Sequence, residues 1–144
     1  MSVNISLFAG AGWQFFDNNG VPLAGGLIYT YAAGTTTPQT TYTTITGNIA
    51  NANPIVLDSA GRVPNEIWLT STLVYKFLVK TSVGTQIASY DNIAPAADSA
   101  TLAASSGSSL IGFIQSGTGA VAETVQTKLR ESVSVKDFGA VGDG

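Results

Sequence analysis

The strongest pattern in the chain is an alternation of side-chain character over residues 73–80. Every second residue is apolar, and two of the residues between them are lysines. Successive side chains of a β-strand point to opposite faces, so a two-residue period predicts a strand with one buried face. The side chains that we expect in the core are Leu73, Tyr75, Phe77 and Val79.

Shorter apolar runs between turn signals predict further strands across residues 13–93. One such turn signal is Asp17-Asn18-Asn19-Gly20, where Asn and Gly tolerate positive φ. In the run that follows it, Leu27, Tyr29 and Tyr31 fall on one face. About seven short strands at this spacing are typical of an antiparallel β-sandwich or barrel. The expected strands are 13–16, 27–31, 40–44, 54–57, 66–69, 73–80 and 87–90.

The pattern changes after residue 97. Residues 98–118 are rich in Ala, Ser and Gly, which predicts a linker after a β domain of residues 1–97. Residues 119–131 are the candidate helix, because Val121, Val125 and Leu129 recur every four residues. We expect residues 132–144 to begin a further β domain, with alternating valines before a turn.

A helix of roughly 12 residues is marginal alone in water and needs a partner. The apolar stripe of Val121, Val125 and Leu129 could form the seam of a trimer or dock on the β domain. Both alternatives are compatible with the spacing. We therefore treat these three residues as a candidate trimer seam in a short helical neck.

Charged residues make up only 10% of the 144 residues, against roughly 25% in a typical soluble domain. Small uncharged polar side chains take their place, which suits β structure and surfaces that other chains cover. The net charge is −3, and no window holds three basic residues close together. Composition thus favours an assembly component and argues against a nucleic-acid partner.

The chain has no Cys and no His. Thiol catalysis, Ser-His-Asp triads and the commonest transition-metal ligands are therefore excluded within these residues. Asp17, Asp58 and Asp91 could supply the paired carboxylates of a glycosidase, but each precedes a residue that favours turns. We interpret them as turn residues, and we expect no catalytic residue and no cofactor.

Two further kinds of ligand site were considered. Asp137 and Asp143 are too few for calcium, which takes 6–8 oxygen ligands, so we expect no metal site. An aromatic platform for sugars is a second alternative, although aromatic side chains on strands more often lie in a core or an interface. Its members would be Trp13, Tyr29, Tyr31, Tyr42 and Trp68.

The first 16 residues contain no basic residue and no long apolar run, unlike a secretory signal. No stretch approaches the ~18 apolar residues of a membrane span. We expect a protein that is made in the cytoplasm and has no membrane partner.

Two stretches resemble known phage sequences. The first combines DNNGVPLAGG at 17–26, YTYAAGTTTP at 29–38 and PIVLD at 54–58, followed by Gly61-Arg62. It resembles the N-terminal domains that attach tail fibres and tailspikes to phage particles. The second, VSVKDFGAVGDG at 133–144, is similar to the opening of pectate-lyase-like right-handed β-helix domains.

The resemblance implies a structural virion protein: an anchor in the phage tail, assembled in the host cytoplasm, that carries a receptor-binding β-helix body. It also implies a homotrimer that contacts other tail or neck proteins and reaches host glycan through the β-helix. Two alternatives remain. The whole protein could be a polysaccharide depolymerase whose activity lies in the β-helix, or residues 1–97 could be a carbohydrate-binding module.

Overall fold

The computed structural model describes residues 2–10, 12–132 and 138. The chain divides into two compact units, residues 1–97 and residues 98–144, which we call unit 1 and unit 2. The structure is mainly β, and all strand pairs within its sheets are antiparallel. The described residues form neither a closed barrel nor a β-helix.

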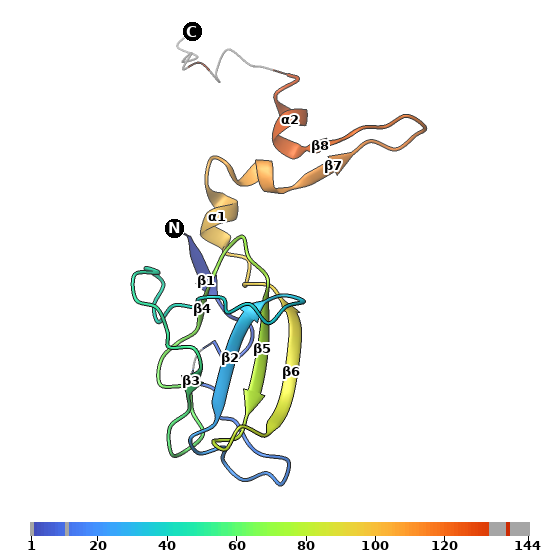
Figure 1. Cartoon of the computed structure of the whole chain (residues 1–144). Helices are drawn as coiled ribbons and strands as arrows, with labels where there is room; N and C mark the ends of the chain where they lie inside the picture. The colour runs from blue at the N-terminus through green and yellow to red at the C-terminus, as the bar shows by residue number, and fades with distance from the viewer. Residues whose placement is uncertain (1, 11, 133–137, 139–144) are drawn as a thin grey trace. The chain divides into compact units, whose positions relative to one another are not determined.

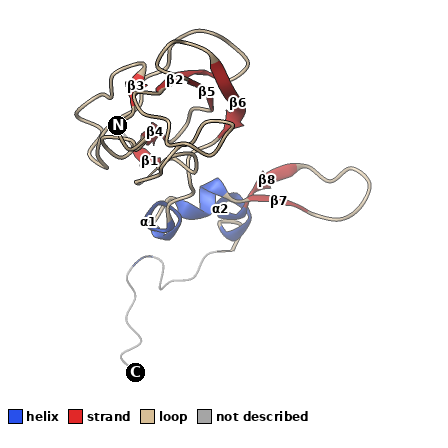
Figure 2. Cartoon of the chain, turned by 90° about the horizontal axis from the view of Figure 1, so that it is seen from below, coloured by secondary structure: helices blue, strands red, loops and turns tan. Residues whose placement is uncertain are grey.

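Unit 1 contains two sheets (Figure 1). The larger has the strand order β3-β2-β5-β6, and the smaller pairs β1 with β4. Seen along the strands, the small sheet lies opposite the concave side of the large one (Figure 2). The strands are β1 (Val3–Ile5), β2 (Leu27–Ala32), β3 (Ile55–Val56), β4 (Trp68–Thr70), β5 (Tyr75–Lys80) and β6 (Gln86–Ile93).

In β5, one face is buried and the other is not, as the alternation of apolar residues predicted. Tyr75, Phe77 and Val79 are buried, and Lys76 and Lys80 lie on the opposite face. The prediction for Leu73 is wrong, because its amide donates to the Thr70 carbonyl in the turn before β5 and its side chain is exposed.

The core lies between the two sheets and draws on most of unit 1. β2 and β4 contribute Ile28 and Leu69, and the loops contribute apolar residues of their own. Burial of these side chains removes apolar surface from water, which is the main stabilising term of the fold. The complete cluster is Ala9, Leu23, Ile28, Ile55, Leu57, Val63, Ile67, Leu69, Tyr75, Phe77 and Val79.

Thr30 is a buried polar residue whose hydrogen-bonding groups are satisfied. Its hydroxyl donates to the Gln39 carbonyl at 2.7 Å. The Asn53 side chain accepts from the Thr30 amide at 3.0 Å and donates to its carbonyl at 2.7 Å. Asn53 thus continues the pairing of β2 beyond β3, as buried backbone groups require.

Two expected strands, 13–16 and 40–44, are only isolated bridges, such as Gln14 with Arg62 and Tyr42 with Trp68. Close to residues 13–16, the loop that contains Gly61 meets the segments at Phe15 and Leu23. Gly61 has φ of +73°. A Cβ at this position would lie 2.6 Å from the Phe15 carbonyl oxygen and 2.7 Å from the Leu23 nitrogen. Position 61 therefore admits only glycine.

Unit 2 contains two short α-helices, one 3₁₀ turn and one hairpin. The elements are α1 (Ser99–Ala103), η1 (Gly107–Leu110), β7 (Gly112–Ile114), β8 (Ala122–Thr124) and α2 (Val125–Leu129). Residues 98–118 were expected to be a linker, and this interpretation is wrong because they form α1, η1 and β7. The expected start of a β-helix falls mainly on residues 133–137 and 139–144, which lie outside the described residues.

The helix predicted for residues 119–131 is also wrong in extent. Ala122, Glu123 and Thr124 pair with β7, so their backbone groups belong to a strand ladder and not to a helix. The Val125 amide extends this pairing by donating to the Ile111 carbonyl at 2.9 Å. The helix begins after Thr124, whose hydroxyl accepts from the Thr127 amide at 3.1 Å as an N-cap.

Candidate functional site

The three carboxylates that could have formed a hydrolytic pair each organise the backbone of a loop. Asp17 Oδ1 accepts from the amides of Asn19 and Val21 at 2.8 and 2.9 Å. Asp58 Oδ1 accepts from the amides of Ala60 and Arg62, both at 2.8 Å. The predicted turn role of these two residues is confirmed.

Asp91 joins two separate segments of unit 1. Its Oδ1 accepts from the Gly34 amide at 3.0 Å and from the Asn92 amide at 2.7 Å, and its Oδ2 lies 3.2 Å from the Gly34 nitrogen. These bonds favour the charged form and lower the pKa of Asp91 below its usual value. The amides of Val21 and Asn19 lower the pKa of Asp17 in the same way. A carboxyl group held in its ionised form is poorly suited to act as a general acid.

The predicted seam residues do not share one helix face. Val121 precedes β8, Val125 is the first residue of α2, and Leu129 is the last. Val125 is half-buried, whereas Val121 and Leu129 are 78% and 64% exposed. A continuous helical seam is therefore absent within these residues, although two of the three side chains remain open to a partner.

Exposed apolar side chains are in fact a general feature of unit 2. Among its described residues, no apolar side chain is buried. Unit 1, by contrast, contains the whole hydrophobic core. The large apolar side chains exposed between residues 98 and 132 are Leu102, Leu110, Ile111, Ile114, Val121 and Leu129.

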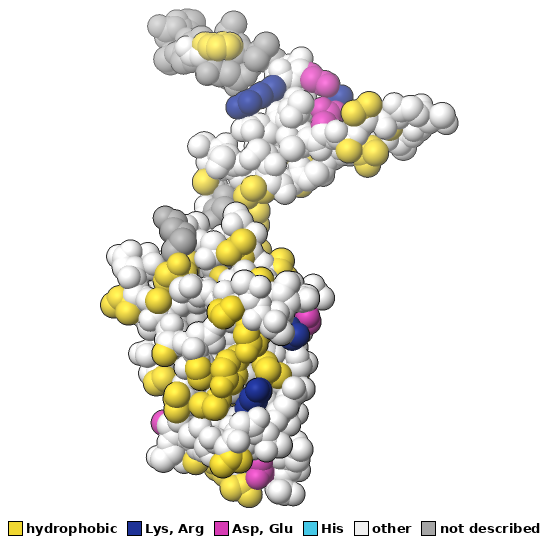
Figure 3. Space-filling view, viewed as in Figure 1, with side chains coloured by type: hydrophobic (Ala, Val, Ile, Leu, Met, Phe, Trp, Pro, Cys, Tyr) yellow, Lys and Arg dark blue, Asp and Glu magenta, His cyan; other side chains and the backbone are white. Residues whose placement is uncertain are grey.

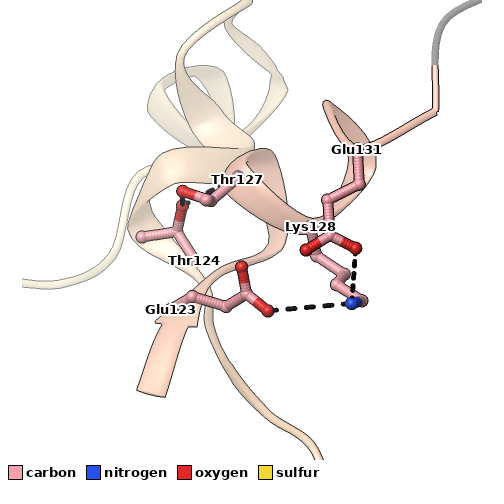
Figure 4. Close-up of polar contacts among 5 residues, drawn as sticks. All are labelled: Glu123, Thr124, Thr127, Lys128 and Glu131. Atoms are coloured by element: carbon pink, nitrogen blue, oxygen red, sulfur yellow. Dashed lines mark hydrogen bonds and ion pairs between the residues drawn. The ribbon is translucent and has the colours of Figure 1, made fainter. Parts of the chain in front are cut away.

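Polar contacts hold the hairpin and α2 together (Figure 4). Lys128 Nζ lies 4.0 Å from Glu123 of β8 and 2.5 Å from Glu131. The Glu131 carboxylate, which accepts a hydrogen bond from Lys128, raises the pKa of that lysine above its usual value. Lys128 Nζ also lies 6.0 Å from the centroid of the Phe113 ring. These contacts connect β7, β8 and α2 without an apolar core.

The five aromatic residues considered for a sugar platform do not gather in one place. Trp68 donates to Glu66 at 2.7 Å and forms a bridge with Tyr42. Trp13 lies 6.2 Å from Phe8, between ring centroids, in a different cluster. Tyr29 and Tyr31 have parallel rings whose centroids are 6.1 Å apart.

Tyr29 and Tyr31 belong to a surface that the sequence analysis did not predict. The register of β2 with β5 sets Leu27 beside Lys80, Tyr29 beside Leu78 and Tyr31 beside Lys76, on the side of the sheet away from the core. We call these six half-buried side chains the outer face. Both alternations were visible in the sequence, but the strand pairing that unites them was not.

A second surface feature of unit 1 is a small groove of about 400 Å³ lined by Leu7, Phe8, Asn92, Ile93 and Ala94. Phe8 lines the groove and also contacts the rings of Phe15, Phe77 and Tyr90. The groove is mostly apolar, and it holds no charged side chain.

Two kinds of site are not found within the described part of the chain. No group of three Asp or Glu side chains there could hold a metal ion. None of the helices described is long and apolar enough to cross a membrane.

Comparison with known proteins gives no family assignment. No protein-family model matches the chain, and no curated protein matches it. Function is therefore inferred from the chain's own residues and surfaces.

Proposed function

We propose that unit 1 is a β-sandwich anchor that attaches a phage tail fibre or tailspike to the tail or neck of the particle. Unit 2 is the connector between this anchor and a receptor-binding body. The phage-like motifs of unit 1 supply turns and close backbone contacts, with Asp17, Asp58 and Gly61 as examples. Such residues suit a structural role.

The observation that carries the proposal is the contrast in burial between the two units. Unit 1 has a closed core, whereas the described part of unit 2 leaves most of its large apolar side chains exposed. Exposed apolar surface of this kind marks contact sites for other chains. A connector in a homotrimer would cover these side chains with two further copies.

Three copies would also strengthen attachment without any chemistry. Each anchor adds its own contact with the particle, and linkage raises the effective concentration of the second and third contacts. Modest surfaces can then hold a fibre for the lifetime of the particle.

The test uses the 144-residue chain and particles grown from a phage stock whose copy of this gene carries an early stop codon. Light scattering of the free chain is expected to give about three times 14.7 kDa, or imaging is expected to show three copies at each docking site. The chain should co-sediment with the particles. Failure to co-sediment would refute the anchoring role, and a monomer in solution together with a single copy at each docking site would refute the trimer.

A carbohydrate-binding module is the alternative for unit 1, and the parallel rings of Tyr29 and Tyr31 would be its aromatic surface. Binding to a panel of bacterial glycans without binding to particles would favour it. A polysaccharide depolymerase is the other alternative, in which the activity would belong to a β-helix body and not to unit 1.

A further inference from the structure

The outer face is an apolar surface with a cation at each end. Leu27, Tyr29, Tyr31 and Leu78 form its middle, and Figure 3 shows hydrophobic side chains gathered over β2 and β5 with basic side chains beside them. Lys76 and Lys80 are four residues apart on β5, which corresponds to roughly 13 Å along a strand. The neighbours of Leu27, Leu78 and Lys80 on β3 and β6 are uncharged: Val56, Ser89 and Gln86. Lys76 has an acidic neighbour on β6, Asp91.

Neither lysine has an ion-pair partner within the described residues, where the ion pairs all involve Lys128. Asp91 is close enough to Lys76 for that lysine to contribute to its lowered pKa, but its oxygens accept from the amides of Gly34 and Asn92. Lys80 Nζ instead lies 5.1 Å from the centroid of the Tyr29 ring. The two positive charges are thus available to carboxylates of another molecule.

The geometry argues against a sugar as the occupant of this face. Stacking of a sugar requires an open ring face. Lys80 covers Tyr29 from the Leu27 side, and the parallel ring of Tyr31 lies along the other side. Tyr29 therefore offers little open ring surface, and Tyr31 alone is not a platform.

A symmetric contact between two copies of the outer face is also disfavoured. Pairing a face with itself would bring Lys76 and Lys80 of one copy against the lysines of the other. Like charges set against each other across an interface are unfavourable and suppress such pairings. The face is complementary to a surface of different charge.

We infer that the outer face is the surface by which the anchor docks on its virion protein, and that this partner presents an apolar ridge flanked by carboxylates roughly 13 Å apart. The apolar centre supplies the buried area, and the two lysines fix the register of docking. This inference rests on the proposed anchoring function and names the residues that perform it.

The experiment measures affinity of the full chain for the stop-codon particles described above, as a function of salt. Lys76→Glu/Lys80→Glu is expected to weaken binding at least tenfold, and Lys76→Arg/Lys80→Arg to retain it. The matched control is Arg62→Glu/Arg130→Glu, which changes the net charge equally at exposed positions that are not among the six residues of this face. Binding of the wild-type chain should weaken as salt is raised, because exposed charges are screened.

A thermal melt of each variant checks folding, and Lys76→Gln/Lys80→Gln replaces the double reversal if that variant unfolds. If the lysine variants bind particles as well as the wild-type chain does, the outer face is not the docking surface, and the proposed anchoring function is unaffected. Loss of the trimer on charge reversal assigns the face to contacts between copies and also overturns the inference. Failure of the wild-type chain to bind particles overturns both proposals, and glycan binding that Tyr31→Ala abolishes would support a carbohydrate module.

Discussion

The buried hydroxyl of Tyr75 donates a hydrogen bond of 3.0 Å to the carbonyl oxygen of Thr40. The same hydroxyl accepts from the Thr70 amide at 3.1 Å. The Tyr75 side chain on β5 thus connects Thr70, the last residue of β4, with the loop that contains Thr40.

Replacing Tyr75 with Phe removes both hydrogen bonds and leaves a backbone amide and a carbonyl without their partner. We expect a loss of about 1–3 kcal/mol in the free energy of unfolding, measured by urea denaturation. Tyr90→Phe is the control, because Tyr90 is 46% exposed and its change is expected to stay within about 0.5 kcal/mol. Equal effects of the two variants would contradict this role of Tyr75.

Phe77→Ala tests the core itself. Phe77 is fully buried and packs against Phe8 at 4.8 Å between ring centroids. We expect the variant to lose roughly 3–5 kcal/mol, enough to unfold a domain of ordinary stability. Val83→Ala, at an 86% exposed position, should melt like the wild-type chain. A wild-type melting temperature for Phe77→Ala would show that this core does not sustain the fold.

Acid should destabilise unit 1 through Asp17 and Asp91. Both have a pKa lowered in the folded chain by backbone amides, so the unfolded chain takes up protons first as pH falls. The stabilisation is complete well above pH ~4 and disappears as pH falls through the lowered values. The melting temperature of Asp17→Asn/Asp91→Asn should therefore depend less on pH between about 5 and 2 than that of the wild-type chain. If the melting temperatures of the variant and of the wild-type chain depended equally on pH, this role of Asp17 and Asp91 would be contradicted.

The 144-residue chain should release no reducing sugar from bacterial capsule or lipopolysaccharide. It lacks His and Cys, and its candidate carboxylates Asp17, Asp58 and Asp91 are bound to loop amides. A reducing-end assay on a panel of polysaccharides provides the measurement. Turnover that an Asp substitution abolishes would overturn the structural interpretation.

The sequence predicted β2 and β5 well because each buries one face, so burial leaves a two-residue period. It did not predict β1, since Val3-Asn4-Ile5 is too short to show a period and pairs with β4 far along the chain. Pairings at long range depend on where the turns bring the strands, which local patterns do not encode.

Unit 2 was misjudged for a different reason. The spacing of Val121, Val125 and Leu129 matches a helix, but the first of them precedes a strand. The useful signal was Thr124, whose hydroxyl caps the amide of Thr127 and marks where a helix can begin. The outer face escaped notice because its two halves lie on strands separated by more than 40 residues of chain.

Gly61 limits which residues the chain can accept at position 61. The backbone at Phe15 and Leu23 occupies the space that a side chain at position 61 would need. The φ of +73° also disfavours any residue other than glycine. In a library that samples all substitutions, position 61 should accept none, although it lies on a loop where replacement is usually harmless. Selection for folding alone would then preserve Gly61, without any contribution from binding.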